Sequence, residues 1–155
     1  MAIGHLLLAS LGIPAPPRFY HQQRVDHFGT SAVTFSQRYY LNDTQWQPGS
    51  PLLVIIGGEG AVPPSQGFFY PFVVDVLAPM MKALVIQPEH RFYGESLPFG
   101  AASFQTSNNL RLLTPQQALA DTVSLIRATQ AERNCSQSRK SPGYCPVFTI
   151  GGSCA

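Results

Sequence analysis

A serine near the end of the chain stands in a setting that suits nucleophilic chemistry. The last nine residues, VFTIGGSCA, read as an apolar strand that runs into a tight turn carrying Ser153. A serine hydroxyl attacks a carbonyl efficiently only when it is exposed, fixed and close to a base. In the G-x-S-x-G turn, small residues beside the serine let the chain pass sharply from strand to helix. Gly151 and Ser153 match the first half of this pattern, and Ala155 replaces its second glycine.

A glycine-rich segment earlier in the chain could complete such a site. The residues GGEG, at positions 57–60, follow an apolar run. A backbone N–H from such a loop and the N–H of the residue after the serine can together stabilise an oxyanion. We therefore expect Gly58 and Cys154 to form an oxyanion hole. A plain strand-ending turn is the alternative, since the spacings of nucleotide-binding glycine motifs are absent.

The strands that would carry these loops are continuous apolar runs. They are expected at Leu52–Ile56, Ala83–Ile86 and Val147–Ile150, and such runs are typical of strands buried on both faces. Helical patterns separate them, which predicts an α/β fold with a mostly parallel sheet. An alternating segment, Val33–Leu41, is expected to form an antiparallel partner for the first apolar strand. In parallel sheets chemistry gathers at the carboxyl ends of the strands.

The clearest helix is expected after Thr114. This residue can cap the helix, Pro115 suits its first turn, and Gln117 completes a capping-box pattern. Asp121 is expected to face solvent or to cap a packing contact. The core-facing stripe is expected to consist of four apolar side chains, namely Ala118, Leu119, Val123 and Ile126.

Six blocks of sequence, taken in order, resemble one family of serine peptidases. The blocks are VDHF, TFSQRYYLND, PLLVIIGGEG, EHRFYGES, LLTPQQALAD and IGGS. The family is that of lysosomal Pro-X carboxypeptidase, dipeptidyl peptidase II and thymus-specific serine protease, and the resemblance covers about residues 25–153. It implies an α/β-hydrolase core with a helical cap, a Ser-Asp-His triad with Ser153 as nucleophile, and exopeptidase cleavage of peptides next to proline. No metal or other cofactor is expected, and a homodimer of the full-length form is left open.

Two departures from this family bear on activity. The family has tyrosine after the serine and glycine shortly beyond, whereas this chain has Cys154 and Ala155. In this fold the acid and the histidine of the triad follow the serine along the chain, and neither follows Ser153 here. His90 is instead expected to be structural, bonded to Glu89 or to a loop carbonyl.

Residues 18–155 are therefore expected to be the N-terminal part of an α/β-hydrolase domain, truncated at the nucleophile turn. The cap and the C-terminal half would be absent, and the chain alone would be inactive. A non-catalytic binding remnant and an esterase or lipase on the same fold are the alternatives. Whether the family member acts as a carboxypeptidase or an aminodipeptidase is left open, because the cap would decide it.

Several features indicate the secretory pathway, with a lysosomal, vacuolar or extracellular destination. Cys135 and Cys145 lie in one polar loop, where a disulfide would suit an oxidising compartment. Asn42 and Asn134 begin N-x-S/T glycosylation sequons. Residues 1–17 are either a signal peptide or a disordered N-terminus left by a misassigned start codon.

Composition excludes several other classes. Charged residues make up only 12% of the chain and hydrophobic ones 45%, which excludes a disordered polyelectrolyte. The net charge of +2 comes without a basic cluster, so nucleic-acid binding is not expected. No apolar run reaches the ~18 residues of a membrane span.

Overall fold

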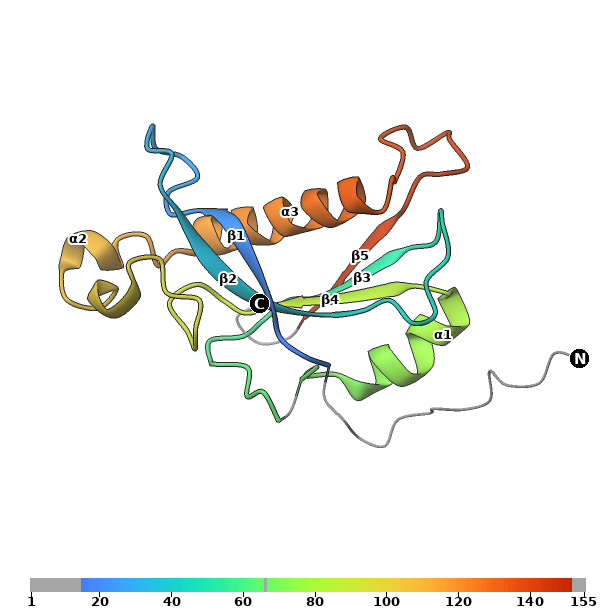
Figure 1. The fold of residues 1–155 in the computed structure, drawn as a ribbon, viewed down its shortest axis with the longest axis horizontal. Coiled ribbons are helices and arrows are strands. Elements are labelled where there is room, and N and C mark those ends of the chain that lie inside the picture. The colour runs from blue at the N-terminus through green and yellow to red at the C-terminus, as the bar shows by residue number, and fades with distance from the viewer. Residues whose placement is uncertain (1–14, 66, 152–155) are drawn as a thin grey trace, which may run out of the picture.

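The computed structural model describes residues 15–65 and 67–151, which form an open five-stranded sheet with helices on both faces (Figure 1). The strands are β1 (Arg18–Arg24), β2 (Thr34–Asn42), β3 (Leu52–Ile55), β4 (Leu84–Pro88) and β5 (Val147–Ile150). The helices are a π-helical turn η1 (Val73–Leu77) continued by α1 (Ala78–Met81), a 3-10 turn η2 (Gly100–Ala102), α2 (Ser107–Leu110) and α3 (Pro115–Glu132).

The sheet is mixed, and its strand order is β1-β2-β4-β3-β5. β3 pairs in parallel with both β4 and β5, while β2 is antiparallel to β1 and β4. The prediction of an α/β fold is thus confirmed, but two details of the sheet were wrong. The sheet is only partly parallel. β2 was expected to pair with β3, but β4 lies between them and pairs with both.

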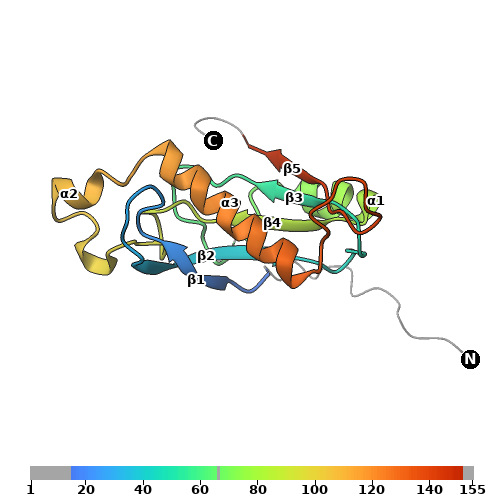
Figure 2. The same cartoon turned by 90° about the horizontal axis from the view of Figure 1, so that it is seen from above.

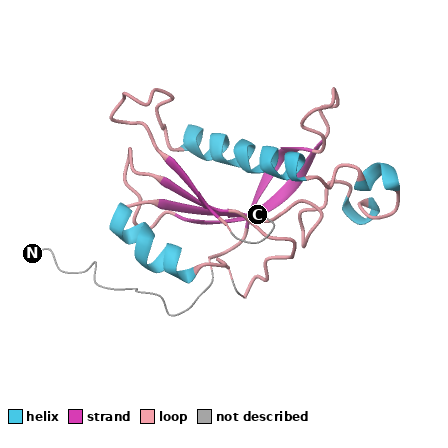
Figure 3. Cartoon of the chain, turned by 180° about the vertical axis from the view of Figure 1, so that it is seen from behind, coloured by secondary structure: helices cyan, strands magenta, loops and turns pink. Residues whose placement is uncertain are grey.

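The order of the strands also decides which face each helix covers. The connection from β3 to β4 moves one way across the sheet, and the connection from β4 to β5 moves back. Because crossovers between parallel strands are right-handed, opposite directions place their helices on opposite faces. Figures 1 and 3 show this result, with α3 on one side of the sheet and α1 on the other. Seen from above, α3 crosses the strands obliquely (Figure 2).

Two apolar clusters fill the layers between the sheet and its helices. Alternate residues of the strands point to opposite faces, so Leu52 joins one cluster and Leu53 the other. The first cluster also contains Leu125 of α3, and the second contains Val73 of η1. A smaller third cluster lies below the loops near α2 and consists of Val25, Phe35, Phe92 and Leu112.

The last strand differs from its prediction as a buried strand. β5 is an edge strand with β3 on one side, and Phe148 is 49% exposed. β3, by contrast, is buried along its whole length. The sequence VFTI therefore predicted the strand correctly but not its position in the sheet.

The inner face of α3 is polar, which contradicts the predicted apolar stripe. Its buried residues are Gln117, Asp121, Thr122, Leu125 and Thr129, while Leu119 is 55% and Val123 44% exposed. Thr114 caps the helix as predicted, since its Oγ1 accepts a hydrogen bond from the Gln117 N–H. The Gln117 side chain does not complete a capping box. It donates to Asp26 and accepts from the His27 N–H, and so ties the helix to the segment after β1.

Asp121 is fully buried, so the prediction that it faces solvent was wrong. Its carboxylate accepts hydrogen bonds from Nε and Nη2 of Arg91, both at 2.7 Å, and from His27 Nε2 at 2.7 Å. Arg91 also donates to the backbone carbonyls of Arg24, Val25 and Leu112. The two charges can be buried because they pair with each other and because hydrogen-bonding groups of the chain satisfy both side chains.

A disulfide joins Cys135 to Cys145 in the loop between α3 and β5. Both sulfur-bearing side chains belong to the cluster that contains Leu52 and Leu125. The disulfide therefore fixes the entry into β5 against the core. In the described part of the chain, no helix combines the length and apolarity needed to cross a bilayer.

Replacing both cysteines by serine should lower the free energy of unfolding by about 2–3 kcal/mol, because the unfolded chain regains the entropy of a loop of about ten residues. Urea denaturation of the Cys135→Ser, Cys145→Ser double variant measures this loss. Reductant should move the midpoint of the parent chain toward that of the variant and leave the variant unchanged. Equal midpoints for parent and variant under oxidising conditions would contradict the expectation.

Candidate active site

The carboxyl ends of β3, β4 and β5 meet at one edge of the sheet, where the predicted chemistry should lie. Beyond the last paired residues, the Ile56 N–H donates to the carbonyl of Ile150 at 2.8 Å. Gly151 therefore leaves β5 directly beside the start of residues 57–62, which we call the glycine loop. The predicted nucleophile Ser153 and its neighbour Cys154 lie outside the described residues.

The glycine loop is tightly packed at its start and open in its middle. A Cβ on Gly57 would lie 2.5 Å from the carbonyl oxygen of Pro88, so only glycine fits there without a backbone shift. A Cβ on Gly58 or Gly60 would have nothing within 4 Å. The Gly60 N–H donates to the Gly58 carbonyl at 2.8 Å, which folds the loop into a tight turn. The side of Gly58 on which a side chain would stand is thus open.

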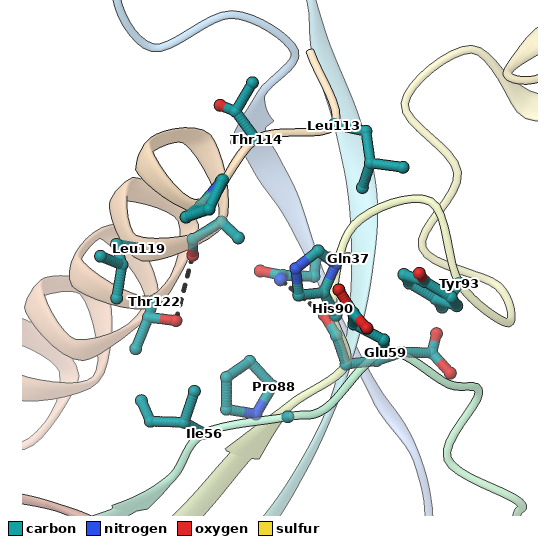
Figure 4. A pocket seen from close by; sticks show the side chains of 14 residues that line it. Gln37, Ile56, Glu59, Pro88, His90, Tyr93, Leu113, Thr114, Leu119 and Thr122 are labelled. Atoms are coloured by element: carbon teal, nitrogen blue, oxygen red, sulfur yellow. Dashed lines mark hydrogen bonds between the residues drawn. The ribbon is translucent and has the colours of Figure 1, made fainter. Parts of the chain in front are cut away.

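A cavity of about 270 Å³ opens beside this loop (Figure 4). Its walls come from the ends of β3 and β4, the loop after β4 and the start of α3. They include both Glu59 of the glycine loop and apolar side chains such as Pro88 and Leu119. A concave site with a few polar groups on a mainly apolar wall suits a small or extended organic ligand.

His90 faces this cavity and has the structural hydrogen bond that its sequence suggested. Its Nδ1 donates to the carbonyl of Arg91 at 2.7 Å, and its ring packs edge-on against Tyr93. The partner is therefore a loop carbonyl, and not Glu89. The other described histidines are also engaged, His21 with Ser36 and His27 with Asp121.

A buried charge network at the wall of the cavity was not predicted. Glu89 is fully buried and pairs with Arg38, which is 3% exposed and also contacts Glu95. Burial alone would lower the pKa of the Arg38 guanidinium, but its hydrogen bond to Glu89 and the charge of that carboxylate raise the pKa overall. One feature of the sequence could have indicated this network: Glu89 directly follows an apolar strand in a chain with few charged residues.

The sequence-predicted modification sites differ in exposure. Asn134 is exposed at the end of α3, and Asn42 is half-buried at the end of β2 with its Oδ1 bonded to Thr44. In residues 15–65 and 67–151, histidine, cysteine, aspartate and glutamate side chains do not gather into a group of three that could hold a metal ion.

The two adjacent glycines of the loop should tolerate alanine very differently. Gly57→Ala forces a methyl group against the Pro88 carbonyl and should destabilise the fold by about 1–3 kcal/mol. Gly58→Ala is the matched control, since its methyl group enters open space. Chemical denaturation of both variants gives the comparison. Equal stabilities would contradict the packing of Gly57 described above.

Comparison with known proteins identifies a family for this chain. The family described as serine carboxypeptidase S28 matches residues 23–154. Lysosomal Pro-X carboxypeptidase of Homo sapiens is 41% identical over 160 residues, covering 96% of this chain and 30% of that protein. The same enzyme of Bos taurus is 46% identical over 139 residues, covering 86% and 26%. Thymus-specific serine protease of Homo sapiens is 41% identical over 137 residues, covering 86% and 25%.

The chain thus spans about 30% or less of the length of these relatives. The matched region contains β2 to β5, the glycine loop and the predicted nucleophile. With a family model that matches most of its length and several relatives at 40% identity or more, this chain belongs to the serine carboxypeptidase S28 family of serine peptidases.

Proposed function

We propose that this chain carries the nucleophile and the oxyanion hole of a serine exopeptidase that cleaves peptides next to proline. The observation that carries the proposal is the hydrogen bond between Ile56 and Ile150, which aligns the exits of β3 and β5. Covalent geometry limits the distance between the Cα atoms of Gly151 and Ser153 to about 7 Å. This short link supports the proposal that Ser153 acts beside the glycine loop, as the nucleophile of an α/β-hydrolase would.

In the proposed reaction the Ser153 Oγ attacks the scissile carbonyl carbon and a tetrahedral intermediate forms. Its negative oxygen accepts hydrogen bonds from the backbone N–H groups of Gly58 and Cys154. Donors held in place before the reaction stabilise this charge without reorganising, and each is worth about 10²–10³-fold in kcat. The open side of Gly58 is compatible with this role, because no other part of the described chain occupies the space where its side chain would stand.

The proton of Ser153 requires a base, and an acid must orient that base. No aspartate or histidine follows Ser153 in the sequence, and the described histidines are engaged in other contacts. We therefore propose that the 155-residue chain by itself does not turn over substrate. Without the triad partners, binding and the oxyanion hole alone would support only a residual rate, several orders of magnitude below that of a complete site.

The cellular setting is proposed on similar grounds. The relatives named lysosomal, the disulfide between Cys135 and Cys145, and the exposed sequon at Asn134 together support a glycoprotein of the secretory pathway.

The direct test is active-site labelling with a fluorophosphonate in the longest natural form that carries this sequence. Ser153 should be labelled, and Ser153→Ala should abolish labelling and lower kcat for a prolyl peptide by about 10⁶-fold. Cys154→Ala is the control, because it keeps the backbone N–H.

Two further outcomes of this experiment are informative. Hydrolysis that survives Ser153→Ala would refute the proposed nucleophile. Cleavage of a p-nitrophenyl ester with no cleavage of any prolyl peptide would instead favour an esterase on the same fold.

A further inference from the structure

We propose that Glu89 is a positioning residue for the site, and that its buried carboxylate, paired with Arg38, fixes the glycine loop. The catalytic consequence rests on the proposed function, whereas the structural part concerns the described residues alone. Glu89 is among the residues that line the cavity, and its carboxylate is occupied by hydrogen bonds to the chain itself. It would act through Val62, the last residue of the glycine loop, and so set where the Gly58 N–H points.

The two oxygens of Glu89 hold two different loops. Oε1 accepts hydrogen bonds from the Val62 N–H at 3.0 Å and from Arg38 Nη2. Oε2 accepts from the N–H groups of Glu95 and Ser96 and from the Ser96 hydroxyl, at 2.8 to 3.1 Å. A carboxylate has only acceptor sites and suits this set of donors, whereas an amide would place its own N–H groups against some of them. The ionised side chain thus joins the glycine loop to the loop after β4.

Arg38 reinforces the same attachment. Its Nη2 donates to the carbonyl of Val62 at 2.8 Å, and its Nη1 donates to Glu95 at 2.6 Å. Both backbone polar groups of Val62 are therefore held, one by Glu89 and the other by Arg38. Gly94 belongs to this arrangement, because a Cβ there would lie 2.0 Å from Glu89 Oε1. The chain must pass the carboxylate closely for the donors beyond Gly94 to reach it.

The glycine loop is thus anchored to the rest of the chain at both ends. Gly57 is packed against the Pro88 carbonyl, and Val62 is held by the ion pair. A Cβ at Gly58 or Gly60 would meet nothing within 4 Å. Their position therefore depends on the two anchors. A misplacement of 1 Å can lower the rate by about 10²-fold. Loss of one anchor should therefore shift the Gly58 N–H enough to reduce catalysis.

A purely structural role for Glu89 is the competing explanation, and the chain contains a matched control for it. Asp121 is also a fully buried carboxylate, and its partner Arg91 is equally buried. Its hydrogen bonds go to Arg91 and His27, not to the glycine loop. Asp121→Asn should therefore reproduce the general cost of disrupting a buried ion pair without loosening residues 57–62.

Amide hydrogen exchange on the 155-residue chain tests the structural part. In Glu89→Gln, exchange at the amides of residues 58–62 should accelerate by about tenfold or more, beyond the change in core strand amides, as expected for losing a hydrogen bond to a charged group. Asp121→Asn should accelerate exchange there only as much as in the core. If Glu89→Gln does not fold, Arg38→Lys serves, because it keeps the charge but lacks the fork that reaches both Val62 and Glu95. Exchange in the glycine loop that is unchanged, or equally raised in Asp121→Asn, would overturn the proposal.

Kinetics in the longest natural form test the consequence. Per folded molecule, Glu89→Gln should lower kcat by about 10²-fold with little change in KM, because a displaced oxyanion donor acts in the transition state. Arg38→Lys should retain more activity, and Asp121→Asn should match the parent. Equal loss of kcat in Glu89→Gln and Asp121→Asn would refute positioning. Activity that survives Ser153→Ala would refute the proposed function, and the exchange result would still decide whether Glu89 holds the loop.

Discussion

The need to neutralise buried charges determines how the loops pack at the carboxyl ends of the parallel strands. Glu89 and Arg91 follow the end of β4 with a single residue between them, and both are fully buried. Neither charge is tolerable in a low-dielectric interior unless the surrounding chain supplies partners. Glu89 takes its partners from β2, the glycine loop and the turn at residues 95–96, whereas Arg91 takes its partners from α3 and the segment after β1. Segments from several parts of the chain therefore pack against the residues that follow β4.

This arrangement couples the geometry of the site to the integrity of the sheet. Breaking a buried ion pair by removing one partner costs about 3–5 kcal/mol, because the other charge is left unpaired. The glycine loop cannot move away from β4 without leaving Glu89 short of donors. His90, which lies between the two charges in sequence, is directed into the cavity by the same fixed backbone. The contacts that pack the end of β4 are thus the same ones that hold the glycine loop beside the cavity.

The sequence was most informative where a local pattern is sufficient. The apolar run at Leu52–Ile56 predicted β3, which forms at Leu52–Ile55 with all four residues buried. Such a run can be recognised without knowing which strands lie beside it. Thr114 and Pro115 predicted the start of α3, because a cap involves only residues within one helical turn. The glycine loop and the family blocks were likewise readable, and the family assignment followed from them.

Only the tertiary structure decided which side of each element is inside. Leu119 and Val123 form an apolar pattern on α3, yet Asp121 and Thr122 are buried instead, because Arg91 and His27 approach that face. His27 and Asp121 are 94 residues apart in the chain. The edge position of β5 similarly depends on the order in which strands pair. Local sequence fixes backbone preference within a few residues, whereas charge pairing and strand order depend on segments that only folding brings together.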